Sequence, residues 1–147
     1  MYCDCCDKAS EILCPKCRYY KIADMIIEDY VSFEIAKLLK EKGFKGDTSC
    51  YYTQDNSKRW IYQHYHDFDK KDRIECPTVQ MAMKWLREKH YKSIEVRSQG
   101  LKATSIGWVV EIFNLVNQDE EFHHPYTFPT YEEACEAAIK YCLKNLI

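Results

Sequence analysis

The chain has 147 residues, 46% of them hydrophobic and 30% charged, a composition typical of one globular domain and not of a disordered chain. Its formal net charge is −2. The basic middle, residues 50–100, carries only ten Lys and Arg against seven Asp and Glu, which disfavours a dedicated nucleic-acid binder. No segment approaches the roughly 20 apolar residues of a membrane span, and the N-terminus lacks the apolar core of a signal peptide. We therefore expect a cytoplasmic protein without a membrane partner.

Five of the nine cysteines fall in the first element of the chain, CDCCDKASEILCPKC, residues 3–17. It contains two C-x2-C pairs separated by seven residues, and two such tight turns can complete a tetrahedral zinc shell. In a reducing cytoplasm thiols bind metal instead of forming disulfides, and an odd number of cysteines fits a disulfide framework poorly. The spacing therefore predicts one zinc ion per chain. The predicted ligands are Cys3, Cys6, Cys14 and Cys17.

This spacing resembles the first half of B-box and zinc-ribbon sites over about fifteen residues, although the later Cys and His pairs of a full B-box are missing. Cys5 is surplus, and the sequence leaves open whether it replaces Cys3 or Cys6 as a ligand. A catalytic zinc ion needs an open position for water. Four thiolates close the shell, so we interpret the site as structural. The plainer alternative is a run of free thiols at the terminus.

Three helices and two pairs of strands are expected downstream. A helix is predicted in residues 31–44, with Ser32 as N-cap and Gly43 at its end. An aromatic hairpin is expected from residues 50–54 and 60–66, and a second helix over 77–90 begins at Thr78. Strands at 93–97 and 107–115 form a second pair. The last helix, 130–147, starts with a capping box of Thr130 and Glu133. Its predicted buried stripe is Cys135, Ala138, Ile139, Cys142 and Leu146.

The predicted order, α-ββ-α-ββ-α, contains a weak internal repeat. IAKLLKEKGF precedes one strand pair and MKWLREKHYK precedes the next. Two αββ units of this kind can pair into one antiparallel four-stranded sheet covered by helices on one face. The predicted fold class is therefore α+β. We expect two parts: a zinc-knuckle module at residues 1–24 and an α+β domain at residues 25–147.

The three helix segments resemble a family of small proteins encoded widely by gut Bacteroidales bacteria, their phages and their mobile elements. The segments are EDYVSFEIAKLLKEKGF, TVQMAMKWLREKH and TYEEACEAAIKYCLKNLI, and the resemblance covers roughly residues 25–147 with variable middle loops. Family members typically begin near Met25, so the cysteine module is an extension. The family has no assigned activity, so the resemblance implies a phage or mobile-element setting and no mechanism.

The other candidates for chemistry have plainer explanations. Cys135 and Cys142 lie a heptad apart and are expected in the core, and no base partner is evident for Cys50 or Cys76. The pair His123-His124 is expected in a solvated loop. Nowhere do a nucleophile, a base and an orienting group stand at a recognisable spacing. We therefore expect no catalysis.

Two functions remain. The first is a zinc-binding, non-enzymatic protein that binds a protein partner. The alternative is a nucleic-acid-binding accessory protein that uses the zinc module and the basic middle. Apolar and aromatic side chains on a module too small to bury them are expected to contact the partner. A nearly equal alternative is that they only brace the N-terminus against the main domain. These residues are Tyr2, Ile12, Leu13, Tyr19 and Tyr20.

Overall fold

The structure is a computed structural model, and it describes residues 28–46, 48–53, 56–61, 73–102 and 105–147. The described part is an α+β fold in which helices and short sheets alternate along the chain. In chain order the elements are α1 (Phe33–Glu41), β1 (Cys50–Thr53), β2 (Asn56–Ile61), β3 (Arg73–Glu75), α2 (Val79–His90), β4 (Lys92–Lys102), β5 (Ser105–Asn114), β6 (Glu120–His123), α3 (Tyr131–Tyr141) and the π-helical turn η3 (Cys142–Leu146).

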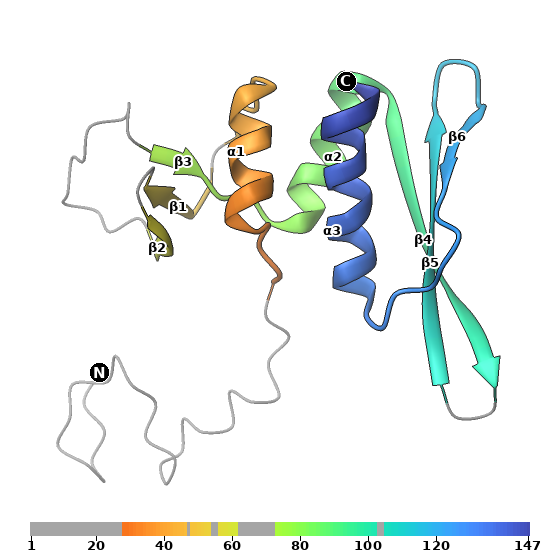
Figure 1. The fold of residues 1–147 in the computed structure, drawn as a ribbon. Coiled ribbons are helices and arrows are strands. Elements are labelled where there is room, and N and C mark those ends of the chain that lie inside the picture. The colour runs from red at the N-terminus through yellow and green to blue at the C-terminus, as the bar shows by residue number, and fades with distance from the viewer. Residues whose placement is uncertain (1–27, 47, 54–55, 62–72, 103–104) are drawn as a thin grey trace, which may run out of the picture.

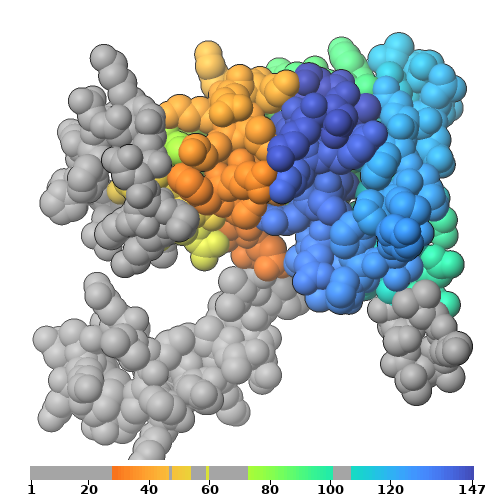
Figure 2. Space-filling model, in the orientation of Figure 1, coloured from red at the N-terminus to blue at the C-terminus, as the bar shows by residue number. Residues whose placement is uncertain are grey.

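The three helices form a layer between two antiparallel sheets (Figure 1). One sheet has the order β2-β1-β3, and α1 packs against its β3 edge. The other sheet is a meander, β4-β5-β6, whose inner face is covered by α2 and α3. In the space-filling view, which has the orientation of Figure 1, α1, α3 and the β5–β6 segment lie against one another (Figure 2). No described helix lies on the outer face of β4-β5-β6, and we call this side of the sheet the open face (Figure 1).

The prediction of one four-stranded sheet with helices on one face is wrong, although the α+β class is confirmed. Each predicted strand pair has a third strand, β3 or β6, and the helices separate the two sheets. Both added strands are short and mostly polar, RIE and EEFH, so alternation of apolar residues did not reveal them. The helices pack on both sheets, α1 on β3 and α2 and α3 on β4 and β5, so the helical layer is covered on two sides, which one sheet cannot provide.

The predicted helix boundaries are largely confirmed because capping is a local property of the sequence. The Thr78 hydroxyl accepts a hydrogen bond from the Met81 amide, and the Thr130 hydroxyl accepts one from the Glu133 amide. Ser32 occupies the predicted N-cap position but makes no side-chain cap. Its backbone amide instead donates to the Glu136 carboxylate in α3, 2.7 Å away. Gly43 follows the end of α1 with a φ of 86°, a conformation that favours glycine.

The buried stripe of the last helix is correct at four positions and wrong at the fifth. Cys135, Ala138, Ile139 and Cys142 are fully buried, as predicted. Leu146 is only partly buried, and Leu143 is buried in its place. Leu143 lies four residues after Ile139, so helical spacing places both on the buried face. Leu146 ends the π-helical turn that begins at Cys142, and this wider turn rotates its side chain relative to an α-helix.

Candidate functional site

Tyr91 ends α2 in a backbone conformation that a tyrosine rarely adopts. Its φ and ψ of 57° and 32° are left-handed, and its amide caps the helix by donating to the Leu86 carbonyl. Glycine is the usual residue at such a helix end, because a β-carbon there costs about 1–2 kcal/mol. The Tyr91 side chain is nonetheless 56% exposed, so burial in the described part of the chain does little to offset that cost.

Two more apolar side chains are exposed beside Tyr91. Leu115 and Val116 form the turn after β5 and are 43% and 74% exposed. The Leu115 amide donates to the Tyr91 carbonyl at 2.8 Å, which holds this turn against the end of α2. We call Tyr91, Leu115 and Val116 the turn patch. Exposed aromatic and aliphatic side chains that gather in this way are typical of interaction surfaces.

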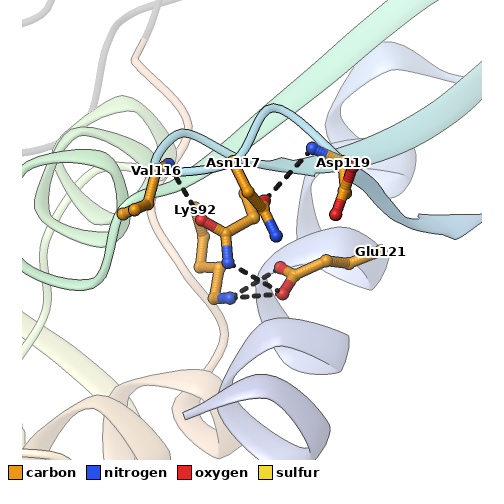
Figure 3. Close-up of polar contacts among 6 residues, drawn as sticks. Lys92, Val116, Asn117, Asp119 and Glu121 are labelled. Carbon is orange, nitrogen blue, oxygen red and sulfur yellow. Dashed lines mark hydrogen bonds and ion pairs between the residues drawn. The ribbon is translucent and has the colours of Figure 1, made fainter.

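A polar network beneath the turn patch fixes its shape (Figure 3). The Lys92 ammonium lies 2.7 and 2.6 Å from the two carboxylate oxygens of Glu121. The Asn114 amide group donates to the same carboxylate at 3.3 Å, and its oxygen accepts the Val116 backbone amide at 2.9 Å. The ion pair on β4 and β6 is therefore connected directly to the backbone of the patch. A fully hydrogen-bonded network of this kind makes the backbone that it joins more rigid.

Two further hydrogen bonds stabilise the turn between β5 and β6, one to a side chain and one between backbone groups. The Asn117 side-chain oxygen accepts a hydrogen bond from the Asp119 amide at 3.2 Å (Figure 3). The Gln118 amide donates to the Asn114 carbonyl at 2.7 Å. Gln118 has a φ of 61° and is, with Tyr91, one of two described residues other than glycine in the left-handed region. Asn side chains commonly stabilise tight turns in this way.

A second cluster lies on the open face of the β4-β5-β6 sheet. Oxygen and nitrogen atoms of Glu111, Glu120 and His123 lie within 4.8 Å of one another. The His123 Nδ1 is 3.2 Å from the Glu111 carboxylate, and the Arg97 guanidinium is 2.8 Å from the same oxygen. The pKa of Glu111 is lowered, first by the hydrogen bond from Arg97. Sequence analysis placed His123 in a solvated loop, whereas the structure places it in β6.

The four described cysteines are poor nucleophiles. Cys50, Cys76, Cys135 and Cys142 are free thiols and all are buried. Burial raises the pKa of Cys135 to about 11 and the pKa values of Cys76 and Cys142 to about 12. The prediction of a core role for Cys135 and Cys142 is confirmed. The fold also places Cys50 against Cys76, whose amide donates to the Cys50 carbonyl at 3.1 Å.

Two depressions lie beside the helices. A pocket of about 220 Å³ opens where α2 and α3 begin, and Asp29, Gln80 and Glu132 are among its lining residues. A groove of about 360 Å³ lies between α1 and α3 and includes Glu34, Glu136 and Lys140. Neither is lined by a cysteine or a histidine.

The site residues predicted from the sequence lie outside the described residues. This holds for the four zinc ligands and Cys5, and for the five partner-binding residues of the N-terminal module. Sequence reasoning missed the turn patch. A signal was available, because an aromatic residue directly after a helix and a Leu-Val pair within a polar turn are both unusual at solvent-exposed positions.

Comparisons of the chain with protein-family models, with curated proteins and with solved structures found no match. No helix in the described residues has the length and apolar character needed to cross a membrane.

Proposed function

We propose that this protein is a non-enzymatic, zinc-binding protein that recognises a protein partner through the turn patch, with the N-terminal cysteine module as a second element. The observation that carries the proposal is the conformation of Tyr91. Residues held in unfavourable backbone conformations cluster at functional sites. A half-exposed tyrosine gains little from the fold, so we infer that its ring contacts another molecule.

The supporting network favours a protein as that molecule. Interface anchors are effective when the free protein already holds them in the bound geometry, because less conformational entropy is then lost on binding. Here the Lys92–Glu121 ion pair and Asn114 fix the turn that carries Val116. Tyrosine, leucine and valine side chains offer aromatic and aliphatic surface that suits an apolar surface on a protein.

The described residues offer little for catalysis, and this supports a binding role. The thiols are buried with raised pKa values, and neither depression brings a nucleophile to a histidine. His90 has a lowered pKa, first because of burial, but its ring packs edge-on against Trp85 at a centroid distance of 4.5 Å. That contact accounts for its position without a chemical role.

The alternative is a nucleic-acid-binding accessory protein, and charge disfavours it. The open face of β4-β5-β6 carries Glu95, Glu111 and Glu120 against one arginine, Arg97. Such a face repels phosphate, and affinity for a nucleic acid depends on the number of phosphates that basic residues neutralise. We retain the phage or mobile-element setting and the Cys3, Cys6, Cys14 and Cys17 zinc site as parts of the proposal.

Site-specific crosslinking tests the proposal. A photo-reactive amino acid at Val116, which is 74% exposed, should capture a protein in the native host. The same probe at Tyr126, 75% exposed but outside the patch, is the matched control and should capture far less. Tyr91→Ala should weaken the capture from position 116.

Equal capture from positions 116 and 126 would show that exposure alone produces the crosslinks, and would contradict a specific surface. Capture of nucleic acid in a strongly salt-dependent manner would favour the alternative, because phosphate contacts release counterions. If Tyr91→Ala leaves the capture from position 116 unchanged, the Tyr91 ring does not contact the partner, and the central argument for the proposal fails.

A further inference from the structure

We propose that Glu111, Glu120 and His123 form a site for a divalent transition-metal ion on the open face of the β4-β5-β6 sheet. The site shares no residue with the turn patch or with the predicted zinc ligands of the N-terminus. It contains two carboxylates and one imidazole, whose ligand atoms already lie within 4.8 Å of one another. Small side-chain movements would bring them to the ~2.0–2.2 Å bonds that such ligands make to these metals.

A β-bulge in β6 brings the side chains of Glu120 and His123 to the same face of the sheet as Glu111. Phe113 pairs with Glu120, and Ile112 pairs with Phe122, so Glu121 is an extra residue in β6. Residues 120 and 123 are separated by an odd number of positions and would face opposite sides of a regular strand. With the bulge, Glu120 and His123 both face outward beside Glu111, while Glu121 is left to bind Lys92 on the inner side.

The ligand geometry is partly formed in the absence of an ion. Glu111 and His123 are directly opposed on β5 and β6, and the His123 Nδ1 lies 3.2 Å from a Glu111 oxygen. That separation is close to the distance between two ligands of one metal ion. Glu111 is held on a central strand with only 16% of its side chain exposed, which gives the site one well-fixed ligand.

The surrounding charge favours a cation. On β4, Glu95 pairs directly with Glu111, and on β6 Glu120 lies opposite Phe113 close to Glu111, so three carboxylates lie near one another on this face. Arg97 supplies the single opposing guanidinium and binds Glu111 at 2.8 and 3.4 Å. A divalent ion would balance the remaining charge. Arg97 competes with that ion for Glu111 and should keep the affinity moderate.

The donor set indicates the class of metal. Imidazole suits zinc and other late transition metals, whereas carboxylates also suit manganese. Thiolates are soft ligands that select zinc or copper over manganese. Mn²⁺ should therefore bind at this site without displacing zinc from the cysteine module. The remaining coordination positions would hold water.

The test uses the full-length, zinc-loaded protein and Mn²⁺ alone as the probe. Substoichiometric Mn²⁺ should broaden the NMR signals of Glu111 and of residues 120–123 before those of α1. Titration followed by electron paramagnetic resonance should give one site with a dissociation constant below ~1 mM, the weak end of known protein cation sites. Weaker or non-saturable binding would overturn the proposal.

Variants locate the site and test the role of Arg97. Glu120→Gln and His123→Gln should each weaken Mn²⁺ binding at least about tenfold, whereas Glu88→Gln, an exposed carboxylate on α2, should change nothing. Arg97→Gln should tighten binding several-fold. Retained affinity in both site variants would overturn the proposal, and unchanged or weaker binding in Arg97→Gln would overturn the competition by Arg97.

Discussion

The Lys92 ammonium binds both carboxylate oxygens of Glu121, at 2.7 and 2.6 Å, across the β4-β5-β6 sheet (Figure 3). Only 9% of the Lys92 side chain is exposed, compared with 23% of the Glu121 side chain. The two partners are therefore unequally buried. An ion left unpaired costs more free energy where water cannot reach it, so the two single substitutions should have different effects.

We expect Glu121→Leu to reduce the free energy of unfolding by ~2–4 kcal/mol, because it leaves the buried Lys92 ammonium unpaired. Lys92→Met should cost less, ~1 kcal/mol, because Glu121 retains access to water. The double variant should recover most of the loss. Urea unfolding measures all three variants. A larger loss for Lys92→Met, or purely additive losses in the double variant, would contradict this account.

Replacing Tyr91 should separate stability from binding. Tyr91→Gly relieves the left-handed strain and should raise the free energy of unfolding by up to ~1 kcal/mol. Tyr91→Ala keeps a β-carbon and should leave stability nearly unchanged. Both should lose partner capture, since both remove the ring. Thermal unfolding together with crosslinking from position 116 tests this, and a destabilised Tyr91→Gly would show that the ring serves the fold.

The cysteine module should bind one zinc ion per chain through Cys3, Cys6, Cys14 and Cys17. Structural zinc in small modules binds with ~10–16 kcal/mol of apparent free energy, so the ion should survive purification without chelator. Elemental analysis provides the measurement, and a metal-free protein would refute the site. Loss of zinc in Cys5→Ser but not in Cys6→Ser would keep the site and reassign the ligand.

Thiol labelling should divide the cysteines into two groups. At pH 8 the buried thiols are almost wholly protonated, because burial raises the pKa of Cys135 to about 11 and the pKa values of Cys76 and Cys142 to about 12. They should label only after denaturation, whereas removal of zinc should expose the N-terminal thiols. Mass spectrometry of the labelled peptides counts both groups. Rapid labelling of Cys142 in the native protein would contradict the raised pKa.

Residues 25–147 should fold without the cysteine module. The described helices and sheets all lie within that range and share one hydrophobic core. About 120 residues can bury enough apolar surface for a stable domain. Calorimetry of the truncated chain should show one cooperative transition. A broad, non-cooperative transition would mean that the module contributes to the core.

The sequence alone determined the features that depend on near neighbours. Thr78 and Thr130 identify helix starts because a cap bonds an amide three residues away. Strand-forming residues located the second strand pair, but in the first pair β2 is Asn56–Ile61, whereas the prediction was 60–66. Helical periodicity located Cys135, Ala138, Ile139 and Cys142 in the core. The cysteine spacing gave the zinc hypothesis in the same local manner.

Only the tertiary structure decided the features that join distant residues. The two sheets lie apart because the helices bury apolar side chains on two sides, and the short polar strands β3 and β6 exist only through their partners. Tyr91 and Leu115 meet through one hydrogen bond across 24 positions of the chain. The bulge at Glu121 turns Glu120 and His123 to one face. Register and bulges depend on packing between strands, and a single strand's sequence does not encode them.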